Sequence, residues 1–212
     1  MSRRRVERAP AIVCALDTAT VTVDYANGRT SAALSRARPQ SPVTPGPRWR
    51  PSWGSQELDY GWHPSPRPTT AHLLLAAPAL ALTLLVRCFG RKNRTMSRAL
   101  WLLRQALRVR TQEATPAEAE RVHSAVRWIG LFLPVRVACL EESVATVLAL
   151  ALIGRHVTWC HGVCADPIEF HAWIRTSDGN LIAEPASTQR FQTLLTVAPH
   201  PREQEEDTHE RT

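Results

Sequence analysis

The sequence predicts an α+β fold in which several helices precede a short antiparallel sheet, and three observations predict it. Four segments between residues 71 and 154 carry apolar residues at helical spacing. Two strand-like runs, HVTWCHGV and FHAWIRT, follow these segments, and an Asp178-Gly179 turn signal then precedes LIAEP. Helices that come first and strands that come afterwards are typical of the α+β class.

The composition indicates a folded chain. A length of 212 residues suits one domain with a small additional module, and 44% hydrophobic residues are enough to bury a core. The net charge of +7 suits an acidic peptide, nucleic acid or a membrane surface, without choosing among them. The start, MSRRRVERAP, lacks an apolar signal-peptide core, and the five cysteines are odd in number. We therefore expect a cytoplasmic protein with free thiols.

The N-terminal third divides into two parts. Residues 1–35 contain the strand-like runs AIVCAL and TVTVDY and the Asn27-Gly28 turn signal, so we expect a small β-rich module. Residues 36–70 are rich in Pro, Arg and Trp, which predicts a linker or irregular arm. Basic residues interleaved with aromatics also suit single-stranded nucleic acid. No nucleic-acid-binding fold accompanies them, so we expect the tryptophans to hold the arm against a neighbouring domain.

Residues 71–197 are expected to form the main domain, followed by a polar, disordered tail over 198–212. The first helix is expected over 71–89. Its uncharged core, from Leu73 to Val86, contains Pro78 and is shorter than the roughly 20 residues that a bilayer requires. A buried or interfacial helix is therefore favoured over a membrane span.

The later helices have clear boundaries. TMSRALWLLRQALRVR, residues 95–110, has leucines at helical spacing. The next helix has Thr115 as its N-cap, Pro116 in the first position and Glu118 in a capping box. The fourth helix begins at Cys139 and stops before Gly154; because it is apolar on most sides, it is expected at the centre of the core.

Cys139 is the candidate nucleophile. A thiol attacks a carbonyl well only as the thiolate, which the positive end of a helix dipole favours. The unpaired N–H groups of the first turn can also stabilise an oxyanion. Glu141 and Glu142 disfavour the thiolate locally, although they stabilise the first helical turn. His171, on the FHAWIRT strand, is the candidate base.

The third group should hold the imidazole. If Asp178-Gly179 forms a two-residue hairpin turn, Trp173 pairs with Glu184, and His171 shares their face. Glu184 is then a diagonal neighbour of His171, and Asp166 in the preceding loop is the other candidate acid. Each residue alone has an ordinary structural interpretation. Together, Cys on a helix start, His on a strand and an acid on the next strand follow the chain order of papain-like and transglutaminase-like sites.

A zinc site is the competing interpretation of this region. Cys160, His161, Cys164 and His171 make four candidate ligands. In a strand, however, His161 faces away from Cys160 and Cys164, and the spacing matches no compact zinc knuckle. We therefore expect no metal.

The stretch VHSAVRWIGLFLPVRVACLEESVATVLALALIGRHVTWCHGV, followed by FHAWI, resembles the C-terminal domain of lasso-peptide B proteins. The matching features are a helix before a proline, Cys139-Leu140, a strand ending in Gly162-Val163, and His-Ala-Trp at 171–173. The resemblance covers about residues 95–195. The family consists of transglutaminase-like cysteine peptidases that remove the leader from a ribosomal precursor peptide. Its acid is usually an Asp, where this chain has Glu184, and the Arg that commonly follows Gly-Val is Cys164 here.

The resemblance implies a papain/transglutaminase-like fold with Cys139 as nucleophile and His171 as base. It also implies that the precursor's leader segment is bound by an N-terminal module as an added β-strand. An asparagine-synthetase-like macrolactam cyclase would then receive the freed amine. Any ATP requirement is expected at that partner, because this chain has no phosphate-binding loop motif and no cofactor is expected in it. A transglutaminase-fold acyltransferase and a non-catalytic precursor-peptide-binding protein are the alternatives.

Overall fold

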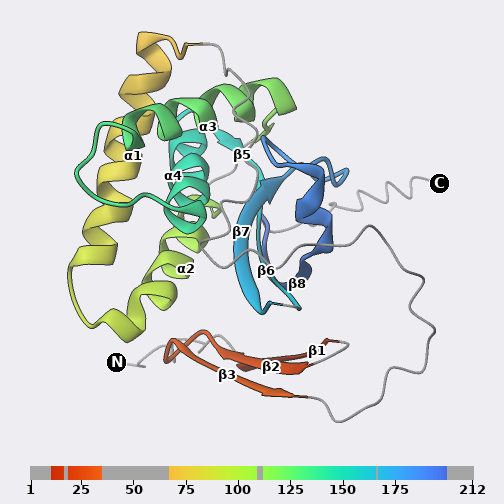
Figure 1. Cartoon of the computed structure of the whole chain (residues 1–212). Coiled ribbons are helices and arrows are strands. Elements are labelled where there is room, and N and C mark those ends of the chain that lie inside the picture. The colour runs from red at the N-terminus through yellow and green to blue at the C-terminus, as the bar shows by residue number, and fades with distance from the viewer. Residues whose placement is uncertain (1–10, 17–18, 35–66, 109–111, 166, 200–212) are drawn as a thin grey trace, which may run out of the picture.

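The computed structural model describes residues 11–16, 19–34, 67–108, 112–165 and 167–199 (Figure 1). The α+β class is confirmed. The helices are α1 (Thr70–Cys88), α2 (Thr95–Ala106), α3 (Pro116–Gly130) and α4 (Cys139–Leu152), with short 3-10 helices η1 (Lys92–Arg94) and η2 (Ala186–Arg190). The strands are β1 (Ala11–Ala15), β2 (Ala19–Asp24), β3 (Arg29–Leu34), β4 (Gln112–Glu113), β5 (Arg155–His156), β6 (Thr158–Cys164), β7 (Glu169–Arg175) and β8 (Gln192–Val197).

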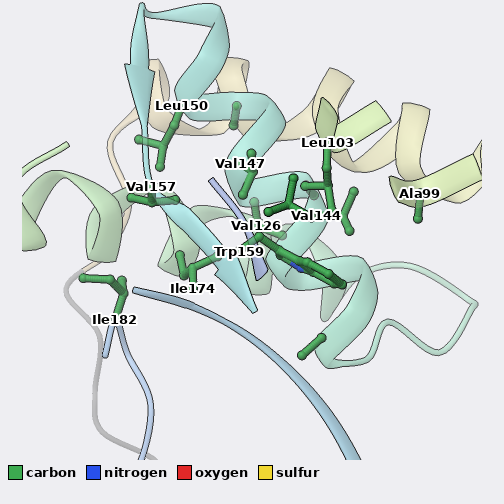
Figure 2. Close-up of a cluster of buried hydrophobic side chains, with 14 of the residues drawn as sticks. Ala99, Leu103, Val126, Val144, Val147, Leu150, Val157, Trp159, Ile174 and Ile182 are labelled. Atoms are coloured by element: carbon green, nitrogen blue, oxygen red, sulfur yellow. The ribbon is translucent and has the colours of Figure 1, made fainter. Parts of the chain in front are cut away.

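Helix α4 is central, as predicted from its apolar sequence. It contacts α1, α2 and α3 and, on its other side, the β7 strand (Figure 1). Val144, Val147 and Leu150 are fully buried, and Figure 2 shows them in the same buried cluster as Trp159 of β6. The indole N–H of Trp159 donates to Ser143 Oγ of α4 at 2.9 Å. The helix that begins with Cys139 is thereby fixed against the sheet by both packing and a buried hydrogen bond.

Local signals explain the helix boundaries. Thr115 and Glu118 form both halves of a capping box at the start of α3. Gly154 has a φ of 68°, a left-handed conformation that favours glycine and ends α4. Helix α2 ends at Ala106, so the helix expected over 95–110 is shorter than the sequence suggested.

The main sheet differs from the predicted one. Its order is β7-β6-β8, with both neighbouring pairs antiparallel. The third strand is β8, from a QTLLTV segment that the sequence analysis did not identify. LIAEP was expected to be that strand, but it contributes only an isolated bridge between Arg175 and Leu181. After β7 the chain therefore turns back, pairs with the end of β7 at Leu181 and Ile182, and then leaves the sheet.

The strands near the N-terminus form a second antiparallel sheet in the order β1-β2-β3. Val21, Val23 and Tyr25 are buried in the same cluster as the core of the main domain. The Tyr25 hydroxyl forms a 2.7 Å hydrogen bond with His161 Nδ1 on β6. This sheet therefore shares the core of the main domain. Residues 1–10, most of the predicted arm (35–66) and most of the predicted tail (200–212) lie outside the described residues, so their predictions stay predictions.

Helix α1 is buried on one side only. Ala76, Ala79 and Leu80 are buried where α1 packs against α3 and α4. Within the described part of the chain, α1 is the one helix long and apolar enough to cross a membrane, and 22% of that stretch is buried. Its packing against the core fits the predicted buried or interfacial helix, and its opposite side is open.

Candidate active site

Cys139 is the first residue of α4, and an ion pair supports the chain just before it. The Glu141 carboxylate accepts the backbone N–H of Ala138 at 3.0 Å. Arg87 of α1 lies 2.9 Å from the same carboxylate and donates to the carbonyl of Arg136 at 2.7 Å. The side chain of Glu141 is buried, so its charge is balanced locally by Arg87. Helix α1 thus holds the segment that leads into the candidate nucleophile.

The second acidic residue after Cys139 is also paired. Arg127 of α3 donates through Nε to Glu142 Oε2 at 2.9 Å. From the sequence, Glu141 and Glu142 were expected to disfavour a thiolate at Cys139. In the structure each carboxylate is paired with an arginine. Nearby His123 is not a base of this site, since burial and the charge of Arg127 lower its pKa to about 3.

His171 lies in the middle of β7 with 2% of its surface exposed. Its Nε2 is 2.8 Å from Glu184 Oε2. The ring is stacked on Trp173, with centroids 5.8 Å apart, and is tilted against Phe191. The side chain of Cys139 also hydrogen-bonds to His171. Because Glu184 takes Nε2, Nδ1 is the ring nitrogen left for the sulfur.

The surroundings of His171 decide its charge. Burial lowers its pKa, but its hydrogen bonds to Cys139 and Glu184, together with the charges of these two groups, outweigh burial, and the pKa is raised to about 9. The imidazole is therefore protonated at neutral pH. An imidazolium beside a cysteine sulfur is the arrangement that stabilises a thiolate in cysteine hydrolases.

The turn before Glu184 has a different register from the predicted one. A two-residue turn would pair Arg175 with Ile182. The structure instead pairs Arg175 with Leu181, and the Ile182 N–H donates to the carbonyl of Ile174 at 3.1 Å. A shift of one residue reverses the face on which each side chain lies. Continued as a regular strand, this register would turn Glu184 away from His171.

Ala183 restores the direction of Glu184. Its φ is 52°, and it is the one residue other than glycine with a positive φ in the described part of the chain. This left-handed residue redirects the chain, so Glu184 reaches His171 with a side chain that is 4% exposed. Glu184 therefore contacts His171, but in a register that differs from the one predicted for a two-residue turn.

Thr188 is a member of the site that the sequence analysis missed. Its hydroxyl, on η2, donates to Glu184 Oε2 at 2.8 Å. The same carboxylate oxygen thus accepts from both His171 and Thr188, which fixes its position. No sequence signal pointed to Thr188, because its place depends on the chain turning at Ala183.

The candidate zinc ligands do not form a cluster in the described part of the chain. Asp166, the alternative acid, lies outside the described residues. Cys160 and Cys164 belong to a small apolar cluster on one face of the sheet, and burial raises the pKa of both thiols. His161 lies in the strand between them and is bonded to Tyr25. Within the described ranges, no three His, Cys, Asp or Glu side chains are grouped as metal ligands would be.

Comparison with known proteins gives one match. The family model described as the transglutaminase-like superfamily matches residues 79–196, which is more than half of the chain. The match includes Cys139, His171 and Glu184. No curated protein and no solved structure matches the sequence.

Proposed function

We propose that this chain, which belongs to the transglutaminase-like superfamily, is a cysteine peptidase that removes the leader from a ribosomally made precursor peptide, as in lasso-peptide maturation. The superfamily includes cysteine peptidases and acyltransferases. The observation that carries the proposal is the contact of His171 with both Cys139 and Glu184. The Cys-Leu and His-Ala-Trp motifs, which resemble those of lasso-peptide B proteins, support the choice of substrate.

The first half of the reaction forms an acyl-enzyme. The Cys139 thiolate attacks the carbonyl carbon at the leader–core junction, and the backbone N–H of Cys139 stabilises the oxyanion, because the first turn of a helix has no internal acceptor for it. His171, charged at neutral pH, gives its proton to the leaving nitrogen as the C–N bond breaks. The core peptide departs as a free amine and the leader stays bound to sulfur as a thioester.

The second half releases the leader. His171, now neutral, takes a proton from water as the water oxygen attacks the thioester carbonyl. The C–S bond breaks and restores the imidazolium–thiolate pair, and the leader acid loses its remaining proton to solvent and departs as a carboxylate. Glu184 holds the ring throughout and balances its charge, while Thr188 holds Glu184. In this proposal the freed core amine passes to an asparagine-synthetase-like cyclase that uses ATP.

The β1-β2-β3 sheet is the proposed leader-binding element. The alternating run TVTVDY is the strand-like segment to which strand addition was assigned from the sequence. It forms most of β2, which is the central strand of the sheet. The edges available to an added strand are therefore those of β1 and β3. An added strand gains affinity from main-chain pairing. A net charge of +7 favours a leader with acidic residues and predicts binding that weakens with salt.

The test is cleavage of a purified precursor by the full chain. Cys139→Ala should bind the precursor and leave it uncut, whereas Cys88→Ala, at an exposed cysteine, should cut normally. Cleavage retained by Cys139→Ala would contradict the assigned nucleophile. Mass spectrometry with added amine distinguishes the alternatives, because an acyltransferase gives a leader amide and a peptidase gives a leader carboxylate. A non-catalytic carrier would give neither product, and its Cys139 would react with iodoacetamide no faster than Cys88.

A further inference from the structure

The exposed side of α1 is a continuous apolar face. Leu74, Leu85 and Phe89 are 75%, 52% and 69% exposed. Thr70 begins this face, and the exposed positions that follow it are apolar: Ala71, Ala77, Pro78, Ala81 and Leu82. These residues recur at helical spacing, opposite the buried Ala76 and Leu80. Apart from the Thr70 hydroxyl at the start of the helix, this face of α1 presents no charged side chain and no oxygen or nitrogen side-chain donor.

The loop between α3 and α4 extends this surface. Leu131 and Phe132 at the start of the loop are 76% and 72% exposed, and Val135 is 46% exposed. A groove of about 400 Å³ runs between the loop and α1, and it is lined almost wholly by apolar side chains, including Leu74 and Phe132. We call the exposed face of α1 together with residues 131–135 the apolar face. Contiguous exposed apolar surface of this kind marks an interaction site.

The charges beside the apolar face all have one sign. Arg91, Lys92 and Arg94 follow Phe89 directly and are exposed, and exposed Arg136 follows Val135. From residue 67 to residue 108 the sequence contains eight Arg or Lys and no Asp or Glu; the basic residues are Arg67, Arg87, Arg91, Lys92, Arg94, Arg98, Arg104 and Arg108. An apolar surface with a basic border is complementary to a bilayer that carries anionic headgroups.

We propose that the apolar face docks on the surface of an anionic lipid bilayer, with α1 lying in the plane of the interface. Protein–protein interfaces contain about one hydrogen bond per 100–200 Å², and beyond Thr70 at the start of the helix the α1 side of this face offers no oxygen or nitrogen side-chain group to make one. The hydrocarbon region of a bilayer requires no hydrogen bonds from the surface that it covers. Helix α1 does not cross the bilayer, because its other side is packed against α3 and α4.

Docking in this orientation involves the candidate active site. The loop that carries Leu131 and Phe132 continues into Cys139, and Arg87 of α1 is bonded to the Arg136 carbonyl in that loop. The start of α4 is therefore attached to the docked face. The proposed peptidase would act at the membrane surface, although the docking itself rests on no assumption about its reaction.

The test is co-sedimentation of the full chain with vesicles. Vesicles of equal parts phosphatidylcholine and phosphatidylglycerol should bind the protein, and pure phosphatidylcholine should bind it much more weakly. The double variant Leu131→Asp/Phe132→Asp should lower partitioning at least tenfold, because aspartate enters the interface poorly. Its control is Leu152→Asp, at a 63% exposed position at the far end of α4, which should bind as the wild type does.

A charge variant gives the second arm. Arg91→Ser/Arg94→Ser should weaken binding to the mixed vesicles by about fivefold per residue removed, and Arg121→Ser on α3 should not. Equal binding by all variants would mean that other basic segments hold the protein, and it would overturn the proposal. Absence of vesicle binding would overturn it as well. If the double aspartate variant instead converts a dimer to a monomer in light scattering, without vesicle binding, the face belongs to a second copy of the chain.

Discussion

Glu184→Gln tests the site at the residue whose position depends on the left-handed turn at Ala183. The substitution keeps the shape of the side chain and removes its charge 2.8 Å from His171 Nε2. Because the hydrogen bond and charge of Glu184 help to raise the pKa of His171 to about 9, the variant should have a lower His171 pKa. Burial, the largest influence, still lowers the pKa, and the interaction with Cys139 still raises it, so the pKa of His171 in the variant should fall below about 9.

The magnitude follows from the protonated fraction. At pH 7.5, about 97% of imidazole groups with a pKa of 9 are charged, compared with about 9% at a pKa of 6.5. A fall of the His171 pKa to the ordinary 6.5 would therefore account for about a tenfold loss of kcat/KM. Loss of the carboxylate that holds and balances the ring adds to this, up to the roughly 10⁴-fold seen when a triad aspartate is neutralised. We expect a total loss of about 10²- to 10⁴-fold.

The assay is a pH profile of precursor cleavage. Wild-type activity should fall as the pH rises through about 9, where the imidazolium is lost, and this alkaline limb should move to lower pH in Glu184→Gln. A raised folded-state pKa stabilises the fold below the unfolded pKa of 6.5, and the stabilisation is lost as the pH rises to about 9. The stability of the wild type should therefore decline over that window, and that of the variant less so. An unchanged alkaline limb, with full activity, would refute the assignment of Glu184.

Substitutions at three further positions test the surroundings of the site. Tyr25→Phe removes the partner of buried His161 and should cost about 1–3 kcal/mol of unfolding free energy in urea titrations. Gly162→Ala would place a Cβ 2.7 Å from the Trp173 ring that stacks on His171, so kcat should fall about tenfold or more, with a loss of about 1–3 kcal/mol of stability. Ala183→Gly should retain activity because glycine accepts a φ of 52°, whereas Ala183→Val should lose most of it.

Two controls keep these tests specific. Val13→Ala changes a 65% exposed position on β1, in the sheet whose β2 strand directly precedes Tyr25, and should leave stability within about 0.5 kcal/mol of wild type. Gly130→Ala adds a Cβ 3.4 Å from Val137, an ordinary contact, and should keep full activity. Equal losses in Gly130→Ala and Gly162→Ala would contradict the argument from Trp173. A fully active Ala183→Val would show that the left-handed turn is not required.

The parts of the fold that the sequence predicted are those specified locally. The Thr115 capping box, the apolar periodicity of α4 and the stop at Gly154 each depend on a few neighbouring residues, and the structure has each of them. Strand β8 depends on pairing with β6, about thirty residues away, and has no turn signal before it. The packing of Tyr25 against His161 depends on contact between segments 136 positions apart. Such contacts leave no periodic trace in the sequence.

Two features of the backbone that were not predicted from the sequence have opposite effects on the direction of the Glu184 side chain, so Glu184 still contacts His171. The turn at Gly179 holds one residue more than a two-residue hairpin, which reverses the face of every later side chain. The left-handed Ala183 then reverses the direction again for Glu184. Alanine gives no warning of a positive φ, which costs it about 1–2 kcal/mol. That cost is offset only where surrounding contacts hold the residue in place, and here Ile182 is bonded to β7 on one side and Glu184 to His171 and Thr188 on the other. Backbone strain at the residue before the proposed acid is what a site that positions a carboxylate would require.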